Sequence, residues 1–393
     1  MPDLIYLANS RLPTEKAHGL QIVQMCEAFV QVGYTVTLVT ARRRNTAALR
    51  SGPDLWTYYG VKRCFAFRRV PCLDLLEIAP SRLQPAAFLL QTLTTLFTLW
   101  FWLLSRRAEV YYTRDLFIGA LMVLTRPRSK LVYEMHQVHS SWLGRRIQSL
   151  IARRAAAVIP ITAHLGEKIR ALGAKRVLVA HDGIRQARFE NMPPQAEARA
   201  EIGWPSDAFI VGWVGRLHLM GADKGVGTLV EALQQVEGVT LALVGGPDEM
   251  ADALHRQWRA RGLDESRFLF AGHVPPDRVP VYLSAFDVCA MPHPWTDHFA
   301  YATSPIKLFE YMASGRAIIA SDLPGFVEVI RHEESALLVP PGNAAALAAA
   351  ITRLRDDWAL RQKLADRART LVFSQYTWSA RAKCIRAFIE EGG

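Results

Sequence analysis

The stretch from Ser304 to Ala320 reads SPIKLFEYMASGRAIIA. It predicts a short helix that carries Glu310, a break at a glycine, and then an apolar β-strand. A helix followed directly by an apolar strand is typical of α/β proteins with a mainly parallel sheet. Pro305 is well placed to start the helix, since the first turn does not need its missing N–H.

Strand-like and helix-like stretches alternate along the rest of the chain. In the first half, strands are expected at 3–9, 34–40, 110–113, 131–136, 157–162 and 176–181, with a helix at 19–32. After the linker NMPP at 191–194, strands are expected at 209–213, 240–245, 268–270, 287–291, 317–321 and 336–339, with a helix at 226–235.

This alternation predicts an α/β protein with two doubly wound, Rossmann-like domains that face a cleft. The first domain is expected at residues 1–190 and the second at 195–373. Residues 374–393 are expected to form a helix that crosses back to the first domain. Ligands of such sheets bind at the carboxyl ends of the strands.

Composition agrees with two domains in a reducing compartment. The chain has 393 residues, of which 50% are hydrophobic, and this is enough for two sizeable cores. Its five cysteines are odd in number and contain no CxxC pair, so reduced packing thiols are expected instead of disulfides or a zinc site. The start lacks a basic segment followed by an apolar one, so we expect no signal peptide and a site that faces the cytoplasm.

Charge is unevenly distributed between the two halves. Residues 1–190 carry 27 Lys and Arg against 12 Asp and Glu, or +15, whereas residues 191–393 carry 20 against 24, or −4. A basic first domain would attract anionic lipid, nucleic acid or an acidic substrate, although it is also compatible with a solvated surface. No motif that reads RNA or DNA is present, so we expect no nucleic-acid partner.

An uncharged segment, AAFLLQTLTTLFTLWFWLL at 86–104, precedes Arg106 and Arg107. As a helix it would be about 28 Å long, just enough to span a bilayer, but Gln91 and four threonines dilute it. Three interpretations remain open: a helix packed on the sheet, a spanning helix, or a helix in the interface with Trp100, Phe101 and Trp102 in lipid.

Two cations follow the expected strand at 209–213. Arg216 comes directly after Gly215, and Lys224 lies eight residues further on, before the helix at 226–235. A guanidinium matches the oxygens of a phosphate, and an ammonium near a helix N-terminus adds a second positive charge for a diphosphate. The alternative for each is an ordinary surface cation.

Glu310 supplies the complementary chemistry. A carboxylate accepts two hydrogen bonds at once, which suits the vicinal hydroxyls of a ribose. The amides near Ser304, Pro305 and Ile306, at the start of the same helix, would face phosphate or sugar hydroxyls. A solvated helical glutamate is the alternative.

Further candidates lie in the first domain. His136 ends the expected strand at 131–136 and would donate to a transferred sugar, while the loop that leads to Gly19 would contact phosphate or an acceptor. Metal ligation by His136 with His139 is an alternative, but no third ligand is near in the sequence. No Asp-x-Asp occurs, so a metal-clamped diphosphate is not indicated.

These motifs resemble those of the GT-B glycosyltransferases, specifically the retaining glycosyltransferase family 4. The second half carries VGWVGRLHLMGADKGVGTLVEAL, LVGG at 243–246, AGHV at 271–274, DVCAMP at 287–292 and SPIKLFEYMASGRAIIASDLPGFVEVI at 304–330. The first half carries HGLQI, YTRD at 112–115 and YEMH at 133–136. The resemblance covers nearly the whole chain and is more specific in its second half.

The resemblance implies a role for each candidate residue. The diphosphate of a UDP- or GDP-sugar would be held by Arg216, Lys224 and Gly215, and its ribose by Glu310. The base would lie by His273 and Val274. Gly19 would line the phosphates, and His136 would approach the sugar. Many members carry a second glutamate eight residues before the position of Glu310, where this chain has Ala302. That departure leaves the donor sugar open.

The expected reaction is metal-independent transfer with retention. It requires no cofactor, since the nucleotide-sugar is the substrate, and Arg216 with Lys224 would stabilise the leaving diphosphate. The expected acceptor is a lipid-linked compound or a polysaccharide, at the inner face of the plasma membrane, to which the basic first domain would bind. Two alternatives remain: a nucleotide-sugar epimerase of the same fold, and a non-catalytic nucleotide-sugar binder.

Overall fold

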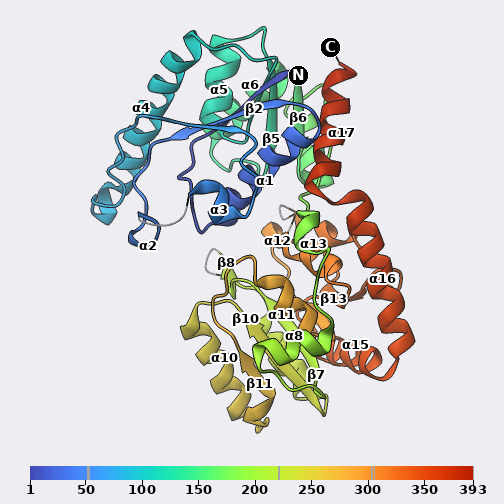
Figure 1. The fold of residues 1–393 in the computed structure, drawn as a ribbon. Helices are drawn as coiled ribbons and strands as arrows, with labels where there is room; N and C mark the ends of the chain where they lie inside the picture. Colours follow the sequence, from blue (N-terminus) through green and yellow to red (C-terminus); the bar gives the residue numbers. More distant parts are fainter. Residues whose placement is uncertain (51–53, 220–221, 302–303, 305, 393) are drawn as a thin grey trace. The chain divides into compact units, whose positions relative to one another are not determined.

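The computed structural model describes residues 1–50, 54–219, 222–301, 304 and 306–392. The chain forms two compact units (Figure 1). The first comprises Met1–His181 with Trp378–Gly393, and the second comprises Asp182–Thr377. The structure therefore divides the chain at His181 instead of residue 190, and the C-terminal return to the first unit starts at Trp378 instead of residue 374.

The first unit contains a six-stranded parallel sheet of order β3-β2-β1-β4-β5-β6. Its strands are β1 (Asp3–Ala8), β2 (Thr35–Ala41), β3 (Ala66–Val70), β4 (Val110–Thr113), β5 (Lys130–Met135) and β6 (Ala157–Pro160). The sequence missed β3, because its AFRRV is an edge strand with exposed arginines. The prediction of a strand at 176–181 was wrong, because in this stretch only Val177 forms a bridge, an isolated one to Val158.

Helices cover this sheet, and one of them comes from the far end of the chain. They are α1 (Ala17–Gln31), α2 (Ala47–Arg50), α3 (Leu55–Tyr59), α4 (Gln84–Leu104), α5 (Leu116–Thr125), α6 (Trp142–Arg154), α7 (Ala163–Ala171) and α17 (Trp378–Glu390). Helix α17 packs on α1, where Trp378 Nε1 donates to Gln24 Oε1 at 2.6 Å. Helices α4 and α17 lie on opposite sides of the unit (Figure 1).

The second unit repeats the architecture, with a parallel sheet of order β11-β10-β7-β12-β13-β14. Its strands are β7 (Phe209–Val214), β10 (Val239–Val244), β11 (Phe268–Phe270), β12 (Val288–Met291), β13 (Ala317–Ser321) and β14 (Leu337–Val339), and β8 (His218–Leu219) pairs with β9 (Ala222–Asp223) separately. Its helices are α8 (Gln195–Ile202), α9 (Val226–Leu233), α10 (Asp248–Ala260), α11 (Val279–Ala285), α12 (Asp297–Tyr301), α13 (Ile306–Ala313), α14 (Pro324–Val327), α15 (Ala344–Asp356) and α16 (Trp358–Gln375). The expectation of two Rossmann-like α/β domains is thus confirmed, while the cleft between them stays a prediction.

The cysteines take no part in cross-links. None of the five, all of which lie within the described residues, forms a disulfide; Cys26 and Cys289 are buried, whereas Cys64 and Cys384 are exposed. Packing thiols were therefore the right expectation for the buried pair only.

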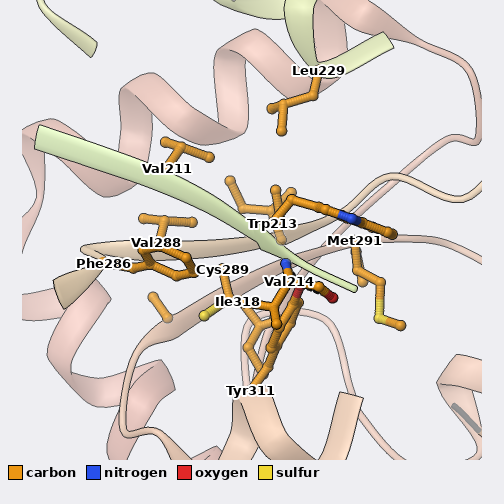
Figure 2. Packing of buried hydrophobic residues seen from close by; sticks show 14 of the residues in the cluster. Val211, Trp213, Val214, Leu229, Phe286, Val288, Cys289, Met291, Tyr311 and Ile318 are labelled. Atoms are coloured by element: carbon orange, nitrogen blue, oxygen red, sulfur yellow. Dashed lines mark hydrogen bonds between the residues drawn. The ribbon is translucent and has the colours of Figure 1, made fainter. Parts of the chain in front are cut away.

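The core of the second unit fixes helix α13 against the end of β7. Tyr311 points toward Val214 (Figure 2), and the Val214 N–H donates to its hydroxyl at 2.7 Å. Pairing between β7 and β12 ends at Gly212, so the Val214 amide needs a partner outside the sheet. Tyr311 provides it, and this holds the helix that carries Glu310 next to the turn that carries Arg216.

Changing Tyr311 to phenylalanine is expected to lower the free energy of unfolding by about 1–3 kcal/mol, because it leaves a buried N–H without a partner. Urea unfolding followed by circular dichroism measures this cost. Tyr282→Phe is the matched control, since the hydroxyl of Tyr282 has no hydrogen-bond partner in the described part of the chain. Equal unfolding midpoints for the two variants would contradict the role given to Tyr311.

Candidate active site

Glycine turns follow three neighbouring strands of the second unit. Gly215 ends β7, Gly245 ends β10 and Gly272 follows β11, all with positive φ, of 134°, 122° and 62°. A Cβ added at Gly245 would lie 2.2 Å from the Gly215 carbonyl oxygen, so these two turns touch through bare backbone. The turns bring Arg216 and His273 to the same edge of the sheet, roughly 10 Å apart because two strand spacings separate them.

Lys224 is positioned by the turn that starts helix α9. Its N–H donates to Leu217 O at 3.1 Å. Gly225 follows with φ 84°, and a Cβ there would lie 1.7 Å from Pro292 O, at the end of β12. Gly225 is therefore required by the close approach of two backbones, and the turn fixes Lys224 at the carboxyl edge of the sheet.

A third cation joins Arg216 and Lys224. Lys307, in the first turn of α13, lies near Gly215. Burial, followed by the charges of Lys307 and Arg216, lowers the pKa of Lys224 to about 8. Three cations close enough to oppose one another's charge favour the binding of an anion, which removes the repulsion.

Glu310 is buried between Lys307 and a fourth cation, Arg188. Its Oε1 lies 3.2 Å from Arg188 Nη1, and its Oε2 lies 2.5 Å from Lys307 Nζ. Burial alone would raise the pKa of Glu310, but Lys307 and Arg188 hold it below its usual value. An ionised carboxylate has about four acceptor positions, so the described residues leave one on each oxygen for a pair of hydroxyls.

Arg188 links this carboxylate to the loop that follows β11. It also donates a hydrogen bond to the carbonyl oxygen of Pro276, three residues after His273. His273 is exposed and Val274 is half-buried against the core. The predicted contacts for ribose and base are therefore held together by one arginine.

The start of α13 is only partly described. The Ser304 hydroxyl accepts a hydrogen bond from the Asp182 N–H at 2.9 Å, and Ile306 begins the helix. Pro305 and Ala302 lie outside the described residues. The expected helix start is thus confirmed to within one residue, while the proline's role stays a prediction.

The pKa of Lys224 predicts how nucleotide affinity depends on pH. The free protein loses this charge above about pH 8, whereas a bound diphosphate favours the charged form and raises the pKa. Binding therefore takes up a proton, and affinity for UDP or GDP is expected to be constant from about pH 7 to 8 and to fall above pH 8. Phosphate ionisation is complete in this range, since its pKa is about 6.

Isothermal titration calorimetry across that range measures the effect. Lys224→Arg keeps the charge throughout and is expected to abolish the fall, whereas Lys224→Gln is expected to bind more weakly with no fall. A Lys224→Gln variant that keeps the wild-type pH dependence would contradict the assignment.

A second polar cluster lies within the first unit, around Glu134. This buried carboxylate accepts hydrogen bonds from four side chains, which are Gln21 Nε2 at 2.8 Å, His136 Nε2 at 2.5 Å, Arg381 Nη1 at 2.9 Å, and the hydroxyl of Tyr112. Burial opposes ionisation, but Arg381, His136 and Arg114 hold the pKa of Glu134 well below its usual value. All its acceptor positions are therefore used.

This cluster determines what His136 can offer. The ring is 19% exposed, and burial and Arg114 lower its pKa to about 4, so it is neutral at pH 7. Because the ionised Glu134 only accepts, the proton lies on Nε2 and leaves Nδ1 as an acceptor. In this arrangement His136 would accept a hydrogen bond from a sugar hydroxyl, instead of donating one as the sequence suggested.

Gly19 has a packing reason to be glycine. It lies in the first turn of α1, and its N–H donates to Lys16 O at 3.0 Å. A Cβ there would lie 2.2 Å from the hydroxyl of Tyr59, which itself exchanges hydrogen bonds with the backbone of Thr14. This contact explains the glycine without a ligand, and a role beside phosphates stays a prediction.

The part of the chain that the structure describes contains no group of three or more His, Cys, Asp or Glu side chains suited to a metal ion. His136 instead contacts Glu134 and Gln21, through the same ring nitrogen. Metal-independent chemistry stays a prediction.

Sequence reasoning missed five residues that shape these two clusters. Lys307 had a detectable signal, since it lies three residues before Glu310 on the same helix face. Arg114 stands inside the quoted YTRD and donates to Gln21. Glu134 stands inside the quoted YEMH, two residues before its partner His136. Arg188 and Arg381 had no signal, because their partners are distant in sequence.

Two parallel six-stranded, Rossmann-like units, one with cations and a carboxylate at the carboxyl edge of its strands, define a protein of the GT-B class. Two family models match the chain: glycosyl transferase 4-like domain at residues 18–183, and glycosyl transferases group 1 at 208–357. The chain belongs to the group 1 glycosyltransferases, glycosyltransferase family 4.

Relatives and solved structures agree with this membership. The lipopolysaccharide core biosynthesis glycosyltransferase LpsD of Rhizobium meliloti is 34% identical over 53% of this chain and 55% of its own length. The 2-deoxystreptamine glucosyltransferase of Streptomyces kanamyceticus is 30% identical over 52% of each chain, so the chain spans about half the length of these two relatives.

Two solved structures share the fold over essentially the whole chain. Sucrose-phosphate synthase from Thermosynechococcus elongatus has a TM-score of 0.78 at 21% identity, covering 100% of this chain and 99% of its own. Anabaena HepE in complex with UDP and glucose has a TM-score of 0.73 at 20% identity, covering 99% and 100%.

Proposed function

We propose that the chain transfers a sugar, with retention and without a metal, from a nucleotide-sugar to a hydroxyl acceptor. The observation that carries this proposal is the cationic cluster of Arg216, Lys224 and Lys307 beside the ionised Glu310. The cations match a diphosphate, and the carboxylate has two positions left for the hydroxyls of a ribose.

The chemistry follows from where charge develops. Cleavage of the bond between the anomeric carbon and the β-phosphate oxygen leaves a negative charge on that phosphate. Arg216 and Lys224 stabilise this charge, assisted by the N-terminal amides of α13. The leaving phosphate takes the proton of the acceptor hydroxyl, which attacks from the same face, so no nucleophilic carboxylate is needed.

His136 is assigned to the donor sugar. Its neutral ring would accept a hydrogen bond from a sugar hydroxyl through Nδ1, while Glu134 holds Nε2. Val274 and His273 would contact the base, and Gly19 would lie near the phosphates. These assignments rest on the family resemblance, and the contacts of Arg188 support the grouping of base and ribose.

The acceptor is proposed to be lipid-linked or a glycan, and the enzyme to act at the inner face of the plasma membrane. The basic first unit supports this location through its attraction for anionic surfaces. Since LpsD is a lipopolysaccharide core biosynthesis glycosyltransferase, a lipid-anchored oligosaccharide is the first acceptor class to test.

Thermal stabilisation by a panel of UDP- and GDP-sugars, with and without magnesium, tests the proposal. UDP-glucose belongs in the panel. We expect one donor to stabilise the protein equally in EDTA and in magnesium, and its nucleotide to be released with acceptor. A donor that is isomerised without acceptor would show an epimerase instead. A folded protein that no donor stabilises would overturn the transferase function.

A further inference from the structure

Helix α4 has its polar side turned inward. Its buried face includes Gln91, Thr92 and Thr95, together with Ala87, Leu99 and Leu103. Gln91 is completely buried, and its amide donates to Asn9 Oδ1 and Thr95 Oγ1, both at 2.8 Å. A helix on the surface of a soluble domain has the opposite polarity.

Further hydrogen bonds tie α4 to the segment that leads into it. The Thr98 hydroxyl donates to Pro71 O at 2.7 Å, and the Leu73 N–H donates to Thr94 Oγ1 at 3.1 Å. At the other end Arg126 donates to Leu103 O. The polar residues that dilute the segment in the sequence thus attach the helix to its own unit.

The outward face of α4 is apolar over its whole length. Eight large side chains of the helix are 37–60% exposed, namely Phe88, Leu89, Leu90, Leu93, Phe97, Trp100, Phe101 and Leu104. Together they expose on the order of 700 Å² of apolar surface, above the few hundred Å² usual for a soluble monomer. A surface of this kind marks an interaction site.

Positive charge flanks this face at both ends. Arg82 precedes α4, Arg106 and Arg107 follow it, and residues 78–108 contain no Asp or Glu. Next to its C-terminal end lies a cavity of about 250 Å³, whose lining includes Trp102, Arg106, Arg107 and Arg68 of β3. None of its three arginines forms an ion pair within the described residues, although Asp3 also lines the cavity.

We propose that α4 lies in the plane of an anionic bilayer, with its outward face among the acyl chains and the arginines of the cavity on lipid phosphates. Aromatic and leucine side chains bordered by arginines are the composition of interfacial helices. A second copy of the chain fits less well, because the first unit carries 28 Lys and Arg against 12 Asp and Glu, a net +16. Two such surfaces repel each other.

The orientation argues against a spanning helix, one of the interpretations that the sequence left open. Among the described residues, Ser81–Leu104 is the helical stretch long and apolar enough to cross a membrane. Crossing would pull Gln91 away from Asn9 and expose the inner polar face to hydrocarbon, at a cost of several kcal/mol per unsatisfied group. Trp100 and Phe101 face outward as expected, whereas Trp102 is half-buried and contacts Arg106 instead.

This inference rests on the proposed function in one respect: membrane binding would serve to bring the enzyme to a lipid-linked acceptor. Binding to vesicles needs neither donor nor acceptor, so it is measured separately. Circular dichroism and thermal unfolding need no ligand and show, for every variant, whether the first unit is folded; donor binding reports separately on the second unit.

The test is co-sedimentation of the full chain with vesicles of phosphatidylcholine alone or mixed with phosphatidylglycerol. Wild type is expected to bind the anionic vesicles. Phe97→Ser with Phe101→Ser is expected to weaken binding at least tenfold. Trp358→Ser, which removes an exposed aromatic residue from α16, is the control and should bind as wild type.

The role of charge is tested in the same assay. Arg106→Gln with Arg107→Gln is expected to weaken binding to anionic vesicles about 30-fold, which is about 2 kcal/mol at roughly 1 kcal/mol per arginine. Arg153→Gln with Arg154→Gln removes the same charge from the end of α6, just before β6 at the opposite edge of the sheet, and should have a much smaller effect.

Two results would overturn the proposal. One is wild-type vesicle binding by the folded Phe97/Phe101 variant. The other is a wild-type chain that binds no vesicles, whether it is a monomer or forms a stable dimer by light scattering. A dimer that the Phe97/Phe101 variant dissociates would assign the face to a second copy.

Discussion

Replacing Arg216 by alanine is expected to lower kcat by about 100- to 1000-fold, the usual cost of losing one donor that stabilises a developing anion. Arg216 is exposed and follows the Gly215 turn at the end of β7, so its removal leaves the core intact. Its charge acts mainly on the β-phosphate as the bond breaks. The dissociation constant of the donor is therefore expected to change far less than kcat.

Steady-state kinetics with the matched donor and acceptor, together with calorimetric donor binding, measure the two effects. Arg256→Ala is the control, because it removes an exposed arginine from α10 of the same unit. Arg216→Lys keeps the charge but lacks the paired N–H donors of the guanidinium, so its kcat should lie between those of Arg216→Ala and the wild type. Normal turnover by a purified Arg216→Ala protein would rule out the assigned role.

Replacing Arg381 by methionine is expected to lower the free energy of unfolding by about 3–5 kcal/mol, because it leaves a buried carboxylate without its main counter-charge. Arg381 and Glu134 are 2% and 0% exposed. In the wild type the lowered pKa of Glu134 contributes stability at neutral pH, which is lost only as pH falls through that pKa. The variant should lack this contribution.

Urea unfolding at pH 7 and at about pH 5 measures the loss, which should be larger at pH 7: without Arg381, burial raises the pKa of Glu134, so the carboxyl of the variant is protonated more readily at pH 5. The double variant Glu134→Gln with Arg381→Met is the control; it should be more stable than Arg381→Met alone, since no unpaired charge remains. Donor binding by the second unit should persist in both. An Arg381→Met protein with the wild-type urea midpoint would show that the ion pair does not stabilise the first unit.

The sheets could be predicted because of how parallel strands are buried. Strands such as β7 and β13 are covered on both faces, so they appear as continuous apolar runs that any reader of the sequence can find. Edge strand β3 is less buried and carries two arginines in five residues, so its sequence does not show the continuous apolar run of a buried strand. The stretch at 176–181 has the composition of a strand but only a single bridge in the sheet.

Residues of the candidate site could be predicted from the sequence where the local backbone conformation requires a particular residue type. Gly215 is required by its φ of 134°, and Gly225 by its φ of 84° and by the close approach of Pro292 O; each has its cation as direct neighbour. No local requirement identifies Arg188 in the sequence, because its partner Glu310 is 122 residues away. The link from Arg381 to Glu134 spans 247 residues and forms only when α17 packs on the first unit.

The sequence by itself determined two parallel α/β units, a cationic turn after β7, and a carboxylate on α13, because short-range periodicity and turn chemistry encode them. Only the tertiary structure decided which charges meet at Glu310 and Glu134, which nitrogen of His136 carries the proton, and which face of α4 is exposed. The physical reason is common to all three. Burial and the pairing of charges are set by contacts between segments that are distant in sequence, and a helix with polar and apolar residues on opposite faces does not record which of them the fold turns inward.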